Sequence, residues 1–579
     1  MRRIVLVGIV AGAVVAPVAD ALAGPRAHET ACLETSGDAG NACLKSYVGA
    51  IERCRRAPDA TCESAVRADG GALDEALGDT ASPVVRRCAD ASVERLGYLD
   101  LDDLAFRIPE ACADFAEDLL DIEFADDLEL LAPDALRCQR NVVRSIRRLR
   151  NTVVRESGPR CFVRAFDGGA CDRARRDARV SRERGLARGR ILSRCGTAFD
   201  ALGLSSLAPG SSTLAERVDE LLGVVIDRGH HFAQRVYPQN DLGPTADFGP
   251  FPVGVRTLVL ADATRLNAGG TGPRPVLTEV YYPSTAAAVT GVPRDIIRVF
   301  GIPITETPSF RDVARAPGRF PLVLFSHGNG GIRFQSFFFA AHLASHGFIV
   351  ATPDHHGNTF VDAALGIVDP ASATNRPLDM SFLIDQFLAF DTTPGHFFEA
   401  GVDPDRIGAS GHSFGGYTTF ALVVGGFALG TFTDPRVKAA LPQAPSALPF
   451  ADDFFASITV PILILGGSID GVTPFPANQQ RPFDNLEPGA AVVGLAGLVG
   501  AGHFTFSDFC EVPRELLSFL GGFEEACEPR HLPWRHAHDI VNFLSLNFFD
   551  AVLNGDPDAL ARLAPGNLAA IEDLVYQSH

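Results

Sequence analysis

The chain has 579 residues, of which 46% are hydrophobic and 21% are charged, a balance that is typical of a globular protein. It excludes a largely disordered chain and a protein with many membrane spans. The formal net charge of −19 argues against nucleic acid as a general partner, because phosphate binding depends on clustered Lys and Arg.

The N-terminus has the pattern of a secretory signal peptide. Arg2 and Arg3 precede an apolar run over residues 4–18, and the Ala-Leu-Ala sequence at residues 21–23 fits a cleavage site. The run is short for a membrane-spanning helix, which needs about 20 residues. We therefore expect removal of residues 1–23 and a secreted or periplasmic protein, with an uncleaved membrane anchor as the alternative.

The cysteines also indicate export. Ten of the 12 lie between Cys32 and Cys195, and Cys510 and Cys527 stand alone near the C-terminus. Even numbers in both groups predict disulfides, which persist in oxidising compartments. A metal site is the competing interpretation, but the chain has no C-x-x-C pair and few histidines accompany the first group, so we expect no metal.

Residues 24–235 are expected to form a Cys-rich helical domain, since this region shows helical periodicity and few β-branched runs. The spacing of its cysteines suggests an internal duplication. The first set is Cys43, Cys54, Cys62 and Cys88, and the second is Cys138, Cys161, Cys171 and Cys195.

Charge is unevenly distributed within this region. Acidic residues crowd positions 100–134, whereas positions 137–194 are rich in arginine. The simplest interpretation is that these charges pair with each other or face solvent. The alternative is that Arg144, Arg147, Arg148 and their neighbours form a face that contacts an anionic cell surface or polymer.

A Pro- and Gly-rich stretch at residues 236–252 predicts a linker, after which residues 253–579 alternate short apolar runs with helical patterns. This alternation predicts an α/β fold with a mostly parallel sheet covered by helices. The expected strands are Val276–Tyr282, Leu322–Ser326, Phe348–Pro353, Ile407–Gly411, Val437–Leu441, Ile462–Gly466 and Ala490–Ala496. The expected helices include Ser336–Ser345, Met380–Phe390 and Gly415–Val424.

A G-x-S-x-G motif spans residues 411–415, between an expected strand and an expected helix. At such a turn the serine has a strained backbone, and side chains at the two glycines would collide with the neighbouring strand and helix. The pattern predicts that Ser413 is a nucleophile.

A serine hydroxyl needs a base to take its proton and an acid to orient that base. The order typical of this arrangement is Ser, acid, His, and it selects Asp470 after one strand and His503 after the next. Asp508 is a rival acid five residues beyond His503. His536 and His538 are rival bases, although a surface or packing role is the default on a helical stretch.

The glycine-rich turn His327-Gly328-Asn329-Gly330-Gly331 follows another strand. Backbone amides in such a turn can stabilise a developing oxyanion, and the expected pair is the amides of Asn329 and Phe414. The alternative is a plain turn. We expect His327 to form structural hydrogen bonds rather than to shuttle protons.

Several segments together resemble bacterial dienelactone-hydrolase-like esterases and platelet-activating factor acetylhydrolases, a group that is also similar to cutinase-type polyester hydrolases. The resemblance covers about residues 248–550. It implies an α/β-hydrolase fold and ester hydrolysis through an acyl-enzyme, without metal or organic cofactor. The segments are FGPFPVGVRTLVL, TEVYYPS, FPLVLFSHGNGG, LASHGFIVATPDHHGNT, LDMSFLIDQFLAF, VDPDRIGASGHSFGG and PILILGGSIDGVTP.

The chain departs from the acetylhydrolases at one position. In those proteins the acid follows the strand just after the nucleophile, where this chain has LPQAPSALP and no matching aspartate. Asp470, one strand later, matches the dienelactone-hydrolase and cutinase-like members, so phospholipid acetyl specificity does not carry over. Short-chain, aryl, lipid-like or polyester esters are the expected substrates, with Phe334 and Phe475 in an apolar wall of the substrate site.

Two further classes stay open. Within enzymes, one scaffold serves lipases, phospholipid acetylhydrolases, polyester hydrolases and amidases. Outside enzymes, the chain could be a surface-binding protein that keeps a hydrolase scaffold without catalysis. The sequence predicts nothing about the oligomeric state.

Overall fold

A computed structural model describes residues 27–56, 62–67, 71–88, 132–158, 173–202, 213–236, 248–487, 493–512 and 531–578, except 533, 570 and 572, with short pieces between 104 and 120 and a few isolated positions. The expected signal peptide and most of the expected linker lie outside these residues. Among the described helices, none is both long and apolar enough to cross a membrane.

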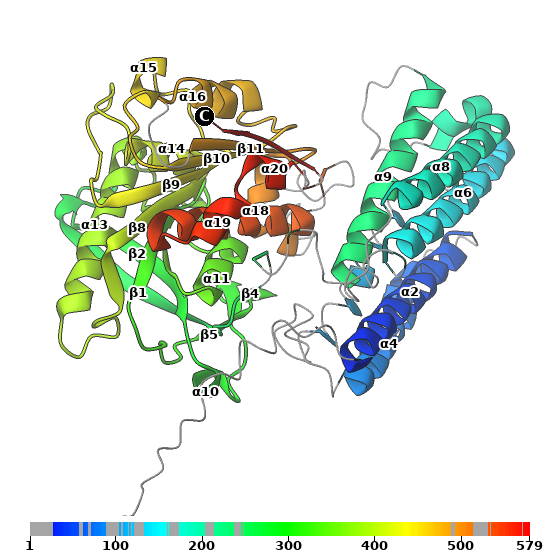
Figure 1. The fold of residues 1–579 in the computed structure, drawn as a ribbon, viewed down its shortest axis with the longest axis horizontal. Helices are drawn as coiled ribbons and strands as arrows, with labels where there is room; N and C mark the ends of the chain where they lie inside the picture. Colours follow the sequence, from blue (N-terminus) through cyan, green and yellow to red (C-terminus); the bar gives the residue numbers. More distant parts are fainter. Residues whose placement is uncertain are drawn as a thin grey trace, which may run out of the picture. The chain divides into compact units, whose positions relative to one another are not determined.

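The chain divides into two compact units, one of helices and one built on a sheet (Figure 1). Residues 1–203 and 213–239 form the first unit, and residues 204–212 and 240–579 form the second. The predicted domain boundaries, 24–235 and 253–579, stay a prediction.

The helical unit contains two groups of packed helices, α2 with α4, and α6 with α8 and α9. Helix α6 buries Val142, Ile146, Leu149 and Val153, whose spacing of three and four residues forms one apolar face. The helices are α2 (Ala27–Arg56), α3 (Cys62–Arg67), α4 (Ala72–Cys88), α6 (Pro133–Ser157), α8 (Arg173–Cys195) and α9 (Leu214–Val236), with the 3₁₀ helix η4 (Gly196–Leu202) after α8.

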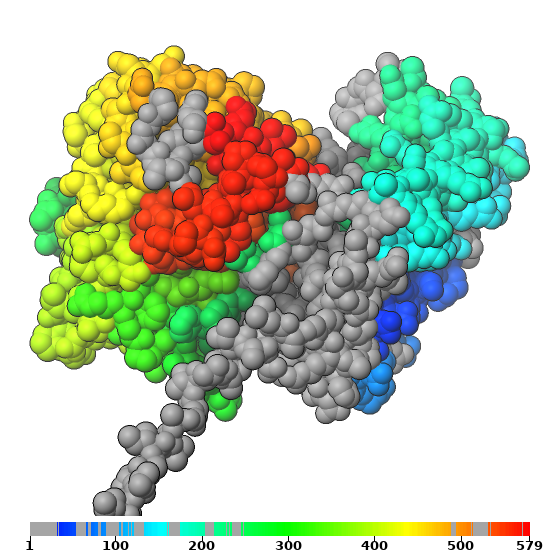
Figure 2. All heavy atoms as spheres, in the orientation of Figure 1, coloured from blue at the N-terminus to red at the C-terminus, as the bar shows by residue number. Residues whose placement is uncertain are grey.

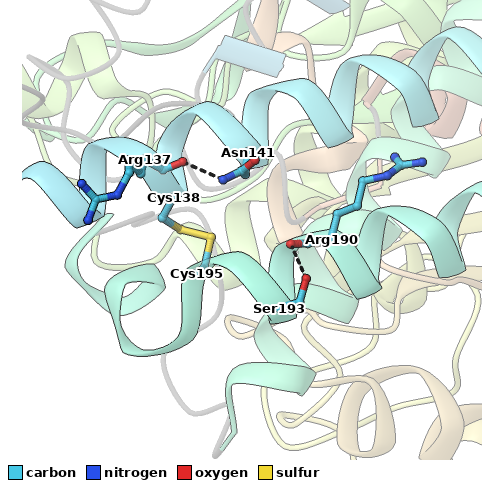
Figure 3. The surroundings of a disulfide bond; sticks show 6 residues. All are labelled: Arg137, Cys138, Asn141, Arg190, Ser193 and Cys195. Carbon is cyan, nitrogen blue, oxygen red and sulfur yellow. Dashed lines mark hydrogen bonds between the residues drawn. A yellow bond between two sulfur atoms is a disulfide. The ribbon is translucent and has the colours of Figure 1, made fainter.

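Disulfides close two helical hairpins in the same way. Cys32–Cys88 joins the start of α2 to the end of α4 across 56 positions of sequence. Cys138–Cys195 joins the start of α6 to the end of α8 across 57 positions (Figure 3). These similar spans match Cys32 with Cys138, whereas the predicted sets match Cys43 with Cys138, and the correspondence of the two sets stays a prediction.

Cys43 instead pairs with Cys112. Cys161, Cys171 and Cys527 lie outside the described residues. Cys510 is disulfide-bonded, and the described part of the chain contains no free cysteine. The expectation that the cysteines form disulfides is thus confirmed for the described pairs, while the duplication itself stays a prediction.

The second unit contains a ten-stranded sheet of order β12-β11-β10-β9-β8-β6-β7-β2-β1-β5. Strands β7, β6, β8, β9, β10 and β11 run parallel, and β2 and β12 pair antiparallel at the two sides of this parallel block. The strands are β1 (Val253–Leu266), β2 (Pro273–Pro283), β5 (Ser309–Arg311), β6 (Phe320–Ser326), β7 (Ile349–Pro353), β8 (Val402–His412), β9 (Val437–Gln443), β10 (Ile462–Gly467), β11 (Val493–Leu498) and β12 (Leu574–Ser578). A separate hairpin contains β3 (Ile296–Val299) and β4 (Ile302–Glu306).

Helices cover both faces of the sheet, as alternation along the strands requires. On β6, Val323 and Phe325 join the core that includes α11 and α18, whereas Leu322 and Leu324 join the core that includes α13 and α14. In the space-filling view the C-terminal residues, in red, cover part of the surface of this unit (Figure 2). The helices are α10 (Ala286–Val289), α11 (Phe337–Ser345), α12 (Phe360–Ala364), α13 (Ser372–Thr392), α14 (Phe414–Ala421), α15 (Asp452–Phe455), α16 (Arg481–Asp484), α18 (Trp534–Phe549), α19 (Pro557–Arg562) and α20 (Pro565–Leu568), with short 3₁₀ and π turns η5 (Pro476–Gln480), η6 (His503–Phe506), η7 (Asp508–Glu511) and η9 (Asp550–Asn554).

The predicted α/β class is confirmed, and the predicted strands correspond to β2 and β6 to β11. Helix α13 begins eight residues before the predicted Met380, although Pro377 lies inside it. Proline lacks the N–H that would bond the carbonyl four residues earlier, that of Ala373. The Tyr417 hydroxyl donates to this carbonyl at 3.1 Å, so the carbonyl is satisfied and the helix continues.

Candidate active site

The turn between β8 and α14 carries Ser413 in a strained conformation, with φ 58° and ψ −115°. Positive φ is uncommon for a residue with a side chain. A Cβ on Gly415 would lie 1.8 Å from the carbonyl oxygen of Ser326, and one on Gly411 would lie 2.5 Å from that of Gly415. Both positions therefore require glycine, which lets the turn pack directly on β6.

Three loops at the carboxyl ends of β8, β10 and β11 bring Ser413, Asp470 and His503 together. His503 Nε2 lies 2.9 Å from Ser413 Oγ, and its Nδ1 lies 2.8 Å from Asp470 Oδ2. The histidine and the aspartate are buried, whereas the serine is partly exposed. The hydroxyl, the imidazole and the carboxylate thus form one hydrogen-bonded series that reaches solvent at Ser413.

Asp470 is fixed by its own loop. Its Oδ1 accepts hydrogen bonds from the backbone N–H groups of Val472 and Thr473 at 2.8 and 2.7 Å, and the Thr473 hydroxyl lies 2.8 Å from Oδ2. Burial raises the pKa of Asp470, but hydrogen bonds from His503 and Thr473 outweigh it and lower the pKa below its usual value. The group therefore stays a carboxylate at neutral pH.

Two residues that the sequence did not identify support the same site. His412 Nε2 lies 3.0 Å from the carbonyl oxygen of His503, and its Nδ1 lies 2.9 Å from Gln335 Nε2. Gln335 Oε1 accepts from the N–H of Gly328 at 3.0 Å. Burial lowers the pKa of His412 to about 3, so its ring is neutral. Nε2 therefore donates a hydrogen bond to the His503 carbonyl oxygen, and Nδ1 accepts one from Gln335 Nε2.

The glycine-rich turn after β6 lies against the turn that carries Ser413, because a Cβ on Gly328 would be 3.5 Å from Ser413 Cβ. Among the described turns and loops, the N–H of Asn329 donates to no backbone carbonyl. Phe414 is the first residue of α14, so its N–H has no partner within the helix. The use of these two amides as an oxyanion-binding pair stays a prediction.

Comparisons with known proteins place this unit. Residues 323–509 match the family model described as PET hydrolase-like (PETase). Over 191 residues the chain is 28% identical to Cutinase 1 of Thermobifida cellulosilytica, which covers 31% of this chain and 60% of the relative. The sheet unit has an α/β-hydrolase fold and is similar in sequence to cutinases, which are serine esterases.

The chain is also similar to an acetylhydrolase and to one solved structure. The platelet-activating factor acetylhydrolase of Cavia porcellus is 21% identical over 287 residues, covering 41% of this chain and 58% of the relative. A solved structure of a ferulic acid esterase from Streptomyces cinnamoneus is 24% identical, covers 56% of this chain and 96% of that chain, and has a TM-score of 0.42. The chain spans about 60% of the length of the first cutinase and 52% of that of a cutinase of Thermobifida fusca. The resemblance predicted from the motifs is confirmed.

The rival residues of the α/β-hydrolase domain have other partners. Asp508 Oδ2 accepts from the backbone N–H of Phe338 at 2.9 Å, and its Oδ1 lies 4.0 Å from His538 Nδ1. The His538 ring stacks on Phe338 at 3.5 Å, and His536 Nε2 lies 3.5 Å from Asp573. Among the described residues, no group of His, Cys, Asp and Glu could hold a metal ion.

His327 forms structural hydrogen bonds within the α/β-hydrolase domain. Its Nδ1 lies 2.7 Å from the carbonyl oxygen of Gly328, and its Nε2 accepts from the backbone N–H of His355 at 3.2 Å. Burial holds the pKa of His327 well below its usual value. The ring is therefore neutral and both nitrogens are occupied.

Phe334 and Phe475 pack against opposite faces of the sheet. Phe334 is half-buried against the α11 side, with the Arg333 guanidinium 4.9 Å from its ring centre. The Phe475 ring, on the other side, lies over Gly466 and Gly497, where an added Cβ would approach within 3.1 Å. Both rings have packing roles, and their contact with substrate stays a prediction.

Proposed function

We propose that the α/β-hydrolase domain cleaves carboxylic esters through an acyl-enzyme on Ser413. The observation that carries the proposal is the series Ser413–His503–Asp470, with distances of 2.9 and 2.8 Å and its hydroxyl end open to solvent. Serine hydrolases on several unrelated folds use the same hydrogen-bonded series, in which serine bonds to histidine and histidine bonds to aspartate.

The steps follow from the hydrogen bonds. His503 Nε2 takes the proton of Ser413 Oγ, and the oxygen attacks the ester carbonyl carbon to form a tetrahedral oxyanion. The amides of Asn329 and Phe414 donate to this oxyanion. The imidazolium then gives its proton to the leaving alcohol, and the acyl group stays on Ser413. Water repeats the sequence to release the acid, so the scheme uses no cofactor.

The substrate class follows from the relatives and from the position of the acid. The relatives named above are cutinases and an acetylhydrolase, and the matched family model is PET hydrolase-like. The loop after β9 contains no aspartate, and the acid stands after β10 instead. This position matches the dienelactone-hydrolase and cutinase-like members rather than the acetylhydrolases, so the proposed substrates are short-chain, aryl, lipid-like or polyester esters.

The first test is a fluorophosphonate probe together with a panel of p-nitrophenyl esters. We expect the folded protein to react with the probe at Ser413, located by peptide mass spectrometry, and to hydrolyse acetate and butyrate esters faster than long-chain ones. Heat-denatured protein is the control and should not react. Absence of both reactions in folded protein would instead favour a non-catalytic, surface-binding role.

The proposal includes export to a secreted or periplasmic location. Cys32–Cys88, Cys43–Cys112 and Cys138–Cys195 are formed in the helical unit. Disulfides persist in oxidising compartments and are rare in the cytosol. The signal peptide expected at residues 1–23 lies outside the described residues.

The proposal also gives the helical unit a surface-binding role through α6. Arg140, Arg144 and Arg148 repeat every four residues, so they lie on one exposed face of the helix. Within the described ranges these three side chains form no ion pair, unlike Arg188, which pairs with Asp219 at 2.8 Å. Three unpaired guanidinium groups in a row favour the phosphate groups of an anionic lipid surface. Arg147, which the sequence grouped with them, is half-buried and lies outside this row.

We expect replacement of Arg140, Arg144 and Arg148 by glutamine to weaken binding of the whole protein to vesicles of equal parts phosphatidylglycerol and phosphatidylcholine. Each basic residue near such a surface contributes about 1 kcal/mol, so the triple variant should lose about 100-fold in affinity. Arg188→Gln is the matched control and should bind normally. Equal vesicle binding by the triple variant and the control would rule out the α6 face.

A further inference from the structure

A second Ser–His–Asp series lies behind the candidate site. Ser326 Oγ is 2.8 Å from His355 Nε2, and His355 Nδ1 is 2.9 Å from Asp379 Oδ2. All three residues have 0% of their surface exposed. A substrate cannot reach this serine, so the second series has a role other than nucleophilic attack.

The ionisation states give every hydrogen bond in this series a direction. Burial lowers the pKa of His355 to about 3, so the ring is neutral. Burial raises the pKa of Asp379, but hydrogen bonds from His355 and Arg274 outweigh it and hold the group as a carboxylate. The ring therefore donates from Nδ1 to Asp379 and accepts the Ser326 hydroxyl proton at Nε2. The lone pairs of Ser326 Oγ can then accept a hydrogen bond from another donor.

Arg376 of α13 is the donor to Ser326. Its Nη2 lies 3.0 Å from Ser326 Oγ and also donates to the carbonyl oxygen of His327. The side chain is fully buried, and its guanidinium lies 4.6 Å from the centre of the Phe414 ring. One guanidinium thus contacts both the strand end that leads into the glycine-rich turn and the residue after the nucleophile.

The other arm of Arg376 reaches Asn329 through one intermediary. Its Nη1 donates to Asn358 Oδ1 at 2.5 Å, and Asn358 Nδ2 donates to Asn329 Oδ1 at 2.9 Å. Asn329 is exposed and is followed by Gly330, with φ 67°. A glycine-rich turn has high conformational freedom unless other groups hold it.

We propose that Arg376 and Asn358, held by the Ser326–His355–Asp379 series, are positioning residues that fix the amide of Asn329 for the oxyanion. This inference rests on the proposed function. A preorganised donor stabilises the transition state without a cost of reorganisation, whereas a mobile donor must be ordered during the reaction. Loss of the positioning residues should therefore lower kcat and leave KM nearly unchanged.

Asn358→Ala tests the proposal without removing a buried charge. We expect kcat for p-nitrophenyl butyrate to fall about tenfold, with KM within about twofold of the wild-type value. The affinity for phenylboronic acid, which forms a tetrahedral adduct on an active serine, should fall by the same factor as kcat. A purely structural role would lower the melting temperature without this parallel loss.

Asn375→Ala is the matched control, because Asn375 precedes Arg376 on α13 and its amide donates to Asp369 Oδ2 at 2.8 Å rather than to Asn329. It should lose some stability and keep its kcat and its boronate affinity. Arg376→Lys keeps the positive charge, but a lysine ammonium cannot bond Ser326 and Asn358 at once as the two guanidinium nitrogens do. A larger fall in kcat, of about 100-fold, is therefore expected.

The proposal is overturned if folded Asn358→Ala keeps the kcat and boronate affinity of the Asn375→Ala control, whether or not Arg376→Lys folds. It is also overturned if kcat falls while boronate affinity does not. Wild-type protein that neither hydrolyses esters nor binds the boronate contradicts the proposed function itself, so the two failures are distinguishable.

Discussion

Replacement of Ser413 by alanine is expected to lower kcat for p-nitrophenyl acetate by at least about 10⁴-fold. His503 Nε2 lies 2.9 Å from Ser413 Oγ, and without this oxygen the imidazole has no nucleophile to deprotonate. Alanine can adopt the same backbone conformation at the same cost as serine, so the circular dichroism spectrum and the melting temperature should not change.

Ser410→Ala is the control for this prediction. Ser410 lies on β8, three residues before Ser413, is fully buried, and donates to the carbonyl oxygen of Leu441 at 2.6 Å. Its variant should lose some stability and still react with a fluorophosphonate. Undiminished turnover by a purified Ser413→Ala protein would show that another residue is the nucleophile.

The centre of the sheet could be predicted from the sequence, because its strands are buried on both faces. All residues of β6 after Phe320 are buried, and such a run of apolar residues is recognisable without knowledge of its partners. The edge strands lack this signal. Strand β12 has one buried residue among five, and the outer half of β1 is mostly exposed, so neither was predicted.

The site was predictable where its residues follow local rules. Ser413 stands in a short motif, and Asp470 and His503 each follow an apolar strand in the expected order. The supporting contacts are not local. Gln335 and His412 are 77 residues apart, and Ser326 and Arg376 are 50 residues apart. A single sequence contains no signal that joins such pairs, because the contact exists only once the sheet has formed.

Asp470→Asn is expected to lower kcat by about 10³- to 10⁴-fold, although the change replaces one oxygen by nitrogen. The N–H groups of Val472 and Thr473 both point at Oδ1, so the amide oxygen of asparagine must take that position. The NH₂ group then faces His503 Nδ1, where Oδ2 stood 2.8 Å away. A donor there can only meet an unprotonated Nδ1, which places the ring proton on Nε2 and prevents the ring from accepting the proton of Ser413.

Asp508→Asn separates this effect from the loss of a buried carboxylate in general. Asp508 is as buried as Asp470, but it accepts from the backbone N–H of Phe338, whereas His503 Nδ1 is hydrogen-bonded to Asp470. Its variant should have a lower melting temperature and a kcat within about twofold of wild type. The sequence alone leaves Asp508 as a rival to Asp470 for the acid that orients His503. A fall in kcat for Asp508→Asn but not for Asp470→Asn would assign that role to Asp508 and remove Asp470 from the series.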